Sequence, residues 1–195
     1  SKLPAVARAF PRNDAYARAT LPQIVGEERV AAARSYPITE LRSGVFLSDA
    51  DGRFRFAPLP RLAQIAPAQG IVAGDFDGDG HADIYLLQND FSFAPSVGRA
   101  DGGLSQFLRG DGSGNFQPVP LAESGLVVTG DAKALVVLDL GRDGRPDFVA
   151  TRNGDTPLVL RHHRGADGRC VSLRLRGPAG NPHAIGAQIT TGGSD

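Results

Sequence analysis

The chain has 195 residues, with 21 basic and 21 acidic side chains, so its formal net charge is zero. A balanced charge supplies no field that recruits nucleic acid or an anionic membrane, and no apolar run approaches the roughly 20 residues of a membrane-spanning helix. The 25 glycines and 14 prolines indicate many turns between short strands. We expect a mainly β protein with no nucleic-acid partner and no membrane span.

Residues 1–42 have a helical pattern that differs from the rest. Asn13 or Asp14 can cap a first helix that runs to Thr20, and the Ala-rich residues 27–35 carry their acids first, as the helix dipole prefers. We expect two short helices in a leader or insertion that covers a sheet edge. No long apolar run follows residues 1–4, which therefore do not begin a signal peptide.

From residue 43 the apolar pattern shortens to a period of two. We expect strands over residues 45–47, 54–56, 71–73 and 84–87, with Asp51-Gly52 as a hairpin turn, grouped in one four-stranded unit over residues 43–103. After a long link, a second unit over residues 104–160 has expected strands at 107–108, 116–119, 135–138 and 148–151. Each unit is predicted to form one sheet.

The first unit contains the pattern DxDxDGxxD over residues 75–83. Four carboxylates within nine residues repel one another unless a cation neutralises them, and hard oxygen donors suit calcium. Position 12 is Leu86 rather than the bidentate Glu of an EF-hand, and the flanks are strand-like, so the ligand set closes early. A solvated turn is the alternative, although turns use one or two Asp residues. We predict a calcium site that comprises the carboxylates of Asp75, Asp77, Asp79 and Asp83 and the backbone carbonyl of His81.

The same loop recurs 64 residues later, where Asp139, Asp143, Gly144, Asp147 and Asn153 repeat Asp75, Asp79, Gly80, Asp83 and Asn89. Gly141 replaces Asp77, and Arg142 and Arg145 add positive charge, so calcium should bind several-fold more weakly here. Whether this loop holds metal stays open. The second, weaker site comprises Asp139, Asp143, Arg145 and Asp147.

An upstream piece also repeats, at an offset of 61 between Phe46 and Phe107. Phe46-Leu47, a turn, Phe54 and Pro58-Leu59-Pro60 correspond to Phe107-Leu108, a turn, Phe116 and Pro118-Val119-Pro120. Self-similarity at about 60 residues predicts a repeat protein whose units bury their faces against neighbours.

These residues resemble a known family. Asp-Phe-Asp-Gly-Asp-Gly over residues 75–80, followed by Ala82-Asp83-Ile84, resembles the FG-GAP or VCBS repeat, the blade unit of integrin-type β-propellers. Residues 171–177, Asn181 and residues 184–187 resemble the start of the ASPIC/UnbV domain of cartilage acidic protein relatives, which we place over residues 161–195. The resemblance implies FG-GAP type blades of a partial propeller, calcium binding, a periplasmic, cell-surface or secreted location, and no established catalysis.

No catalytic residues are predicted, and the sequence contains no nucleophile elbow, P-loop or zinc spacing. His162 and His163 are adjacent on an expected strand, so we expect them to point to opposite faces and to share no metal or substrate. Arg109-Gly110-Asp111 is the tripeptide that integrins recognise, but it occupies the repeat's own turn, which argues against cell adhesion through it. Cys170 is expected to be a small buried hydrophobe in a strand over residues 169–175.

Two functions fit these observations. The first is a non-catalytic, calcium-binding scaffold for an unknown protein or carbohydrate ligand. The second is part of a calcium-dependent polysaccharide hydrolase or lyase, which an acid pair about 5 to 10 Å apart in a metal-free pocket would favour. Because a propeller needs at least four blades, we expect one stretch of a longer extracytoplasmic protein, which alone self-associates or uses the helices of residues 1–36 as a cover.

Overall fold

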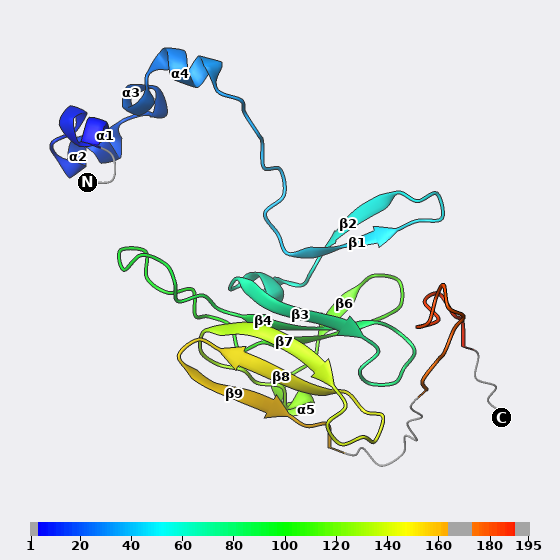
Figure 1. Ribbon diagram of the computed structural model, residues 1–195. Helices are drawn as coiled ribbons and strands as arrows, with labels where there is room; N and C mark the ends of the chain where they lie inside the picture. Colours follow the sequence, from blue (N-terminus) through cyan, green and yellow to red (C-terminus); the bar gives the residue numbers. More distant parts are fainter. Residues whose placement is uncertain (1–3, 164–172, 190–195) are drawn as a thin grey trace. The chain divides into compact units, whose positions relative to one another are not determined.

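The computed structural model describes residues 4–163 and 173–189, and the chain divides into two compact units between Leu41 and Arg42 (Figure 1). The first unit contains four short helices rather than the expected two. The expected pair corresponds to α2 and α4, whereas α1 and α3 were not predicted. The bounds are α1 (Pro4–Ala9), α2 (Asn13–Arg18), α3 (Leu21–Val25) and α4 (Glu27–Ala32).

A capping box explains why α3 begins where it does. The backbone N–H of Thr20 donates to the side-chain oxygen of Gln23 at 2.8 Å, and the Thr20 side chain accepts from the backbone of Gln23 in return. Pro22 follows in the first turn, where its missing N–H costs nothing. The Thr-x-x-Gln pattern was therefore a readable signal for this helix.

The second unit is built from three antiparallel sheets, so the chain is mainly β, as expected. Two short helical segments, η1 and α5, link the strands. The hairpin is β1 (Gly44–Ser48) and β2 (Phe54–Pro58); the four-stranded sheet is β3 (Ala68–Gly74), β4 (Asp83–Gln88), β5 (Gln106–Gly110) and β6 (Phe116–Pro118); the three-stranded sheet is β7 (Ala132–Leu138), β8 (Asp147–Arg152) and β9 (Asp155–Leu160). The helical segments are η1 (Arg61–Gln64) and α5 (Leu121–Ser124).

The sheets are out of phase with the sequence repeat. The prediction that the four strands of residues 43–103 form one sheet is wrong, because β1 and β2 pair with each other while β3 and β4 are completed by β5 and β6. The physical reason lies in β4, whose six residues are all buried and need a strand on each edge. Strand β5 supplies the second edge through the pairs Ile84–Leu108 and Tyr85–Phe107.

The offset between the hairpins also needs a correction of one residue. Ser48 pairs with Phe54 in the first hairpin, and Gly110 pairs with Phe116 in the second, which makes the structural offset 62 rather than 61. A shift of one residue exchanges the faces of a strand, so Phe46 corresponds to Leu108 and not to Phe107.

Strand β4 divides the core into two clusters. Tyr85 and Leu87 belong to a cluster shared with the β7–β9 sheet, whereas Ile84 and Leu86 belong to a cluster with Leu108 on the other face. Successive side chains of a strand point to opposite faces, so β4 is buried between two layers. The four-stranded sheet is thereby fixed on both sides, and the loop that precedes β4 starts from a rigid support.

The sheets approach most closely where β3 meets β7. A Cβ on Gly70 would lie 2.9 Å from the backbone nitrogen of Leu135, so a larger residue here would push the strands apart. Each of these strands carries an irregularity at the same place, between Ala68 and Gly70 in β3 and between Ala132 and Ala134 in β7. The offset of 64 in the sequence is therefore also an offset in backbone geometry.

The C-terminal expectations are tested only in part. Residues 173–189 form turns, held by a pair of hydrogen bonds between Asn181 and Ile185, and contain no strand at 173–175. Cys170 and the rest of the expected strand, residues 169–172, lie outside the described residues. Among the described residues, no helix has the length and apolar character needed to cross a membrane.

The role of β4 predicts a large effect of truncating its core. Leu86 is fully buried, and replacing it with Ala should lower the free energy of unfolding by about 2–5 kcal/mol through lost burial and a residual cavity. Leu62, which is 46% exposed in η1, is the matched control, and Leu62→Ala should cost less than about 1 kcal/mol. Urea unfolding measures both. Equal losses would show that β4 is not the centre of the core.

Candidate functional site

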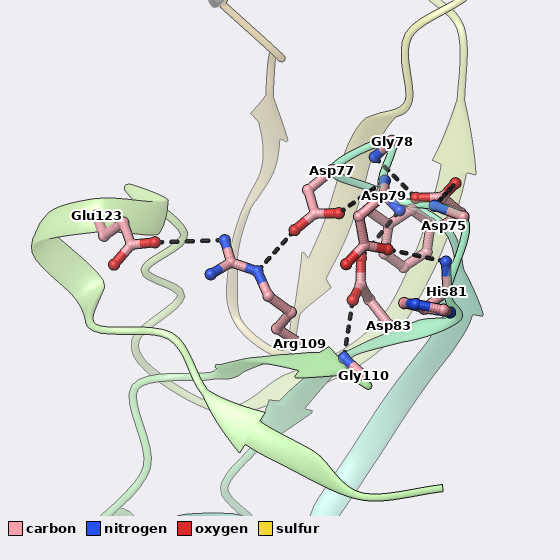
Figure 2. A network of polar contacts seen from close by, with 11 residues as sticks. Asp75, Asp77, Gly78, Asp79, His81, Asp83, Arg109, Gly110 and Glu123 are labelled. Carbon is pink, nitrogen blue, oxygen red and sulfur yellow. Dashed lines mark hydrogen bonds and ion pairs between the residues drawn. The ribbon is translucent and has the colours of Figure 1, made fainter. Parts of the chain in front are cut away.

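The first acidic loop connects β3 to β4 at one end of the four-stranded sheet (Figure 2). It brings Asp75, Asp77 and Asp83 together, with one carboxylate oxygen of each within 4.8 Å of the others. Asp75 and Asp77 lie on the exposed side, whereas Asp83 is buried. Three of the four carboxylates in the predicted ligand set thus converge.

This cluster fits a calcium ion by distance and by donor chemistry. Calcium takes six to eight oxygen ligands at about 2.3 to 2.6 Å, so two ligands on opposite sides of one ion lie about 5 Å apart. The separations within the cluster stay inside this limit. Carboxylate oxygens are hard donors, which calcium prefers over nitrogen or sulfur.

The loop backbone is organised around Asp75. Its two carboxylate oxygens accept the backbone N–H groups of Gly78 at 2.7 Å and Gly80 at 3.0 Å. Both glycines have φ near +85°, a conformation that side chains with a Cβ rarely adopt. The glycines of the motif therefore let the chain curl around one carboxylate.

Asp79 and His81 hold different positions from those three carboxylates. The Asp79 carboxylate accepts the backbone N–H of His81 at 2.8 Å, and Asp79 is not part of the three-carboxylate group. The His81 ring lies against Gly112, where an added Cβ would collide with it. The structure therefore places the His81 side chain in packing with the next turn, while the prediction concerned only its carbonyl.

Asp83 has a structural role that the sequence did not reveal. One carboxylate oxygen accepts the backbone N–H of Phe76 at 3.1 Å, and the other accepts the backbone N–H of Gly110 at 3.0 Å, as Figure 2 shows for Gly110. Phe76 lies in the loop and Gly110 ends β5. A single buried carboxylate therefore ties the loop to the neighbouring strand.

The second loop, between β7 and β8, repeats this tie. Asp147 accepts the backbone N–H groups of Leu140 at 2.9 Å and Gly141 at 3.4 Å with one oxygen, and that of His162 at 2.9 Å with the other. These bonds, the one from His162 first, hold the pKa of Asp147 below its usual value. The tie between loop and strand is thus a property of both repeats.

The second loop differs from the first where metal would bind. Asp139 accepts from the backbone of Asp143 and Gly144, each at 3.0 Å, and Asp143 accepts from Arg145 at 3.1 Å. Arg142 occupies the place of Gly78 with φ +53°, a strained conformation for a residue with a side chain. Within residues 4–163 and 173–189, no three of these groups converge as they do in the first loop.

Arg109 is a neighbour of the first loop that sequence reasoning missed. Its guanidinium donates to Asp77 at 2.7 Å and to Glu123 of α5 at 3.3 Å, so it lies between the two carboxylates (Figure 2). The hydrogen bond to Asp77 is the main reason that the pKa of Arg109 is raised. Arg109 therefore links a candidate calcium ligand to the next segment of the chain.

All three residues of the Arg109-Gly110-Asp111 tripeptide have partners within the fold. Asp111 accepts from the backbone N–H of Ser113 at 2.8 Å and from the side chain of Asn115 at 2.9 Å, and these bonds lower its pKa. Gly110 is buried and donates to Asp83. The tripeptide occupies the repeat's turn, as the sequence predicted.

The prediction for His162 and His163 is wrong. Strand β9 ends at Leu160, so the two residues are not on a strand and do not alternate between faces. Both line one cavity, together with Arg109 and Glu123. Alternation was applied two residues beyond the end of the strand.

Comparison with known proteins supports one part of the resemblance. Residues 34–86 match the FG-GAP-like repeat, and this stretch contains the whole first acidic loop. No curated protein matches the chain. The repeat match agrees with the mainly β sheets as β-propeller blades, and the resemblance of the C-terminal segment to ASPIC/UnbV stays a prediction.

The tie made by Asp83 predicts a stability effect that does not need calcium. Asp83→Asn replaces one acceptor oxygen with a donor that faces a backbone N–H, so the free energy of unfolding in EDTA should fall by about 1–3 kcal/mol. Asp79→Asn is the matched control, because this exposed carboxylate lies outside the tie, and it should cost less than about 0.5 kcal/mol. If denaturant unfolding gives equal values, Asp83 does not act as a tie.

Proposed function

We propose that this chain is a calcium-binding, non-catalytic β-propeller scaffold that acts outside the cytoplasm and presents a surface to a protein or glycan ligand. The observation that carries the proposal is the convergence of Asp75, Asp77 and Asp83 on a loop with a hydrogen-bonded frame. Asp79 and the carbonyl of His81 complete the proposed ligand set. Calcium, when bound, supplies the positive charge that such a cluster of carboxylates requires.

The scaffold proposal gains support from how the loop is held. Asp83 joins the loop to β5, and β4 is buried on both faces, so the exposed carboxylates project from a rigid edge. FG-GAP-like repeats are usually found in extracellular proteins, where calcium is near millimolar and a site of modest affinity fills. We therefore infer an extracytoplasmic location, with calcium as the cofactor.

We propose that the second loop binds calcium more weakly or remains without it. Gly141 removes one carboxylate, and Arg142 adds both a charge and a left-handed backbone conformation. We also infer that the C-terminal segment is the start of an ASPIC/UnbV-like region, on the residues that carry that resemblance.

The alternative of a polysaccharide hydrolase or lyase rests on one observation. Asp77 and Glu123 line the same cavity, as an acid pair would. Arg109, however, lies between them and bonds to both. A general acid must hold a proton at the start of the reaction, whereas a guanidinium stabilises the charged carboxylate, so the pair is arranged for structure rather than acid–base chemistry.

Calcium binding predicts a gain in stability that depends on the first loop. For a dissociation constant of about 0.1 mM, calcium at about 1 mM should raise the free energy of unfolding by about 1.4 kcal/mol. Asp75→Asn should remove most of this gain, because Asp75 both frames the loop and faces the cluster. Thermal unfolding with calcium and with EDTA measures the difference.

Asp139→Asn is the matched control for this experiment, since Asp139 holds the equivalent place in the second loop. It should leave the gain with calcium nearly unchanged. A parent protein that unfolds at the same temperature in calcium and in EDTA would show that the first loop is only a turn.

A further inference from the structure

A cavity of about 650 Å³ lies between the four-stranded and the three-stranded sheets, beside the first loop. Its walls come from β5, α5, β8 and β9, and from the residues that follow β9. Cavities of roughly 300–1,000 Å³ are typical of small-molecule sites. The volume therefore suits a ligand of two fused rings or larger.

The floor of the cavity is aromatic. Phe107 and Phe148 belong to the buried core, and Phe76 packs against both, with ring centroids 6.4 Å from Phe107 and 5.1 Å from Phe148. Leu160 adds an aliphatic side chain to the same wall. A flat apolar group can be desolvated on this floor, and aromatic surface supplies a large part of binding energy in such pockets.

The rim carries two arginines in equivalent positions of the two sheets. Leu108 pairs with Ile84 in one sheet, and Leu160 pairs with Phe148 in the other, at positions of β4 and β8 that are 64 residues apart. Arg109 and Arg161 each follow these leucines. The next residue in each case, Gly110 or His162, donates its backbone N–H to the buried aspartate.

The two arginines differ in their partners. Arg109 is neutralised by Asp77 and Glu123. Gly141 stands where Asp77 stands in the first loop, so Arg161 has no matching carboxylate and forms no ion pair within the described parts of the chain. Asp147 acts on Arg161 only through space, because its oxygens are occupied by three backbone N–H groups.

We propose that this cavity binds a small organic acid with a flat apolar body, which rests on Phe76, Phe107 and Phe148 while its carboxylate pairs with Arg161. A guanidinium binds a carboxylate through two parallel hydrogen bonds, which favours this anion over a neutral group of the same shape. The loss of Asp77's counterpart in the second loop thus frees a cation for a ligand. The proposal does not depend on calcium in the first loop.

The test uses 1-naphthaleneacetate and its uncharged amide, 1-naphthaleneacetamide, with the full chain. The chain has no tryptophan, so naphthalene fluorescence anisotropy reports binding with little protein background. The parent should bind the acid about tenfold more tightly than the amide. Arg161→Gln should weaken the acid about tenfold and leave the amide unchanged, whereas Arg161→Lys should retain part of the preference.

Arg55→Gln is the matched control, because Arg55 is an exposed arginine of β2 outside the cavity, and it should bind both probes as the parent does. Unchanged amide binding and circular dichroism show that Arg161→Gln is folded. The proposal is overturned if the parent shows no saturable binding of the acid at millimolar concentration, if acid and amide bind equally, or if Arg161→Gln binds the acid like the parent.

Discussion

The site depends on one interaction, a buried aspartate that joins an acidic loop to the neighbouring strand of its sheet. Asp83 and Asp147 each accept backbone N–H groups from two segments that are distant in sequence. A buried carboxylate is costly unless its oxygens are hydrogen-bonded, so each tie is strongly favoured only in the assembled sheet. Loop, strand pairing and sheet therefore form together.

This arrangement divides the acidic motif into two roles. The last aspartate of the pattern holds the loop in place, while the earlier ones, Asp75 and Asp77, remain on the exposed side where an ion can reach them. Arg109 extends the same frame to α5. In the second repeat the tie is kept although the carboxylate at the third position is lost, which leaves Arg161 beside the cavity with a different chemical environment.

The local features of the sequence predicted much of this fold. The acidic loop, the strands on either side of it and the 64-residue offset all depend on neighbours in the chain, and the structure reproduces the offset in β3, β4, β7 and β8. The assignment of strands to sheets did not follow, because alternation identifies a strand but not its partner across a long link. Two different offsets, 64 for the loops and 62 for the hairpins, were the signal that these pieces repeat separately. The roles of Asp83 and Arg109 depend on long-range contacts that no local pattern contains.

The central claim is that the first loop is an ordered calcium site on a preformed frame. Isothermal titration of the full chain with calcium and then with magnesium tests this most directly, because magnesium requires a tighter octahedron than these carboxylates provide. The account predicts one tightly bound calcium per chain, with much weaker binding of magnesium. Equal affinity for the two ions, or no heat of calcium binding, would contradict it.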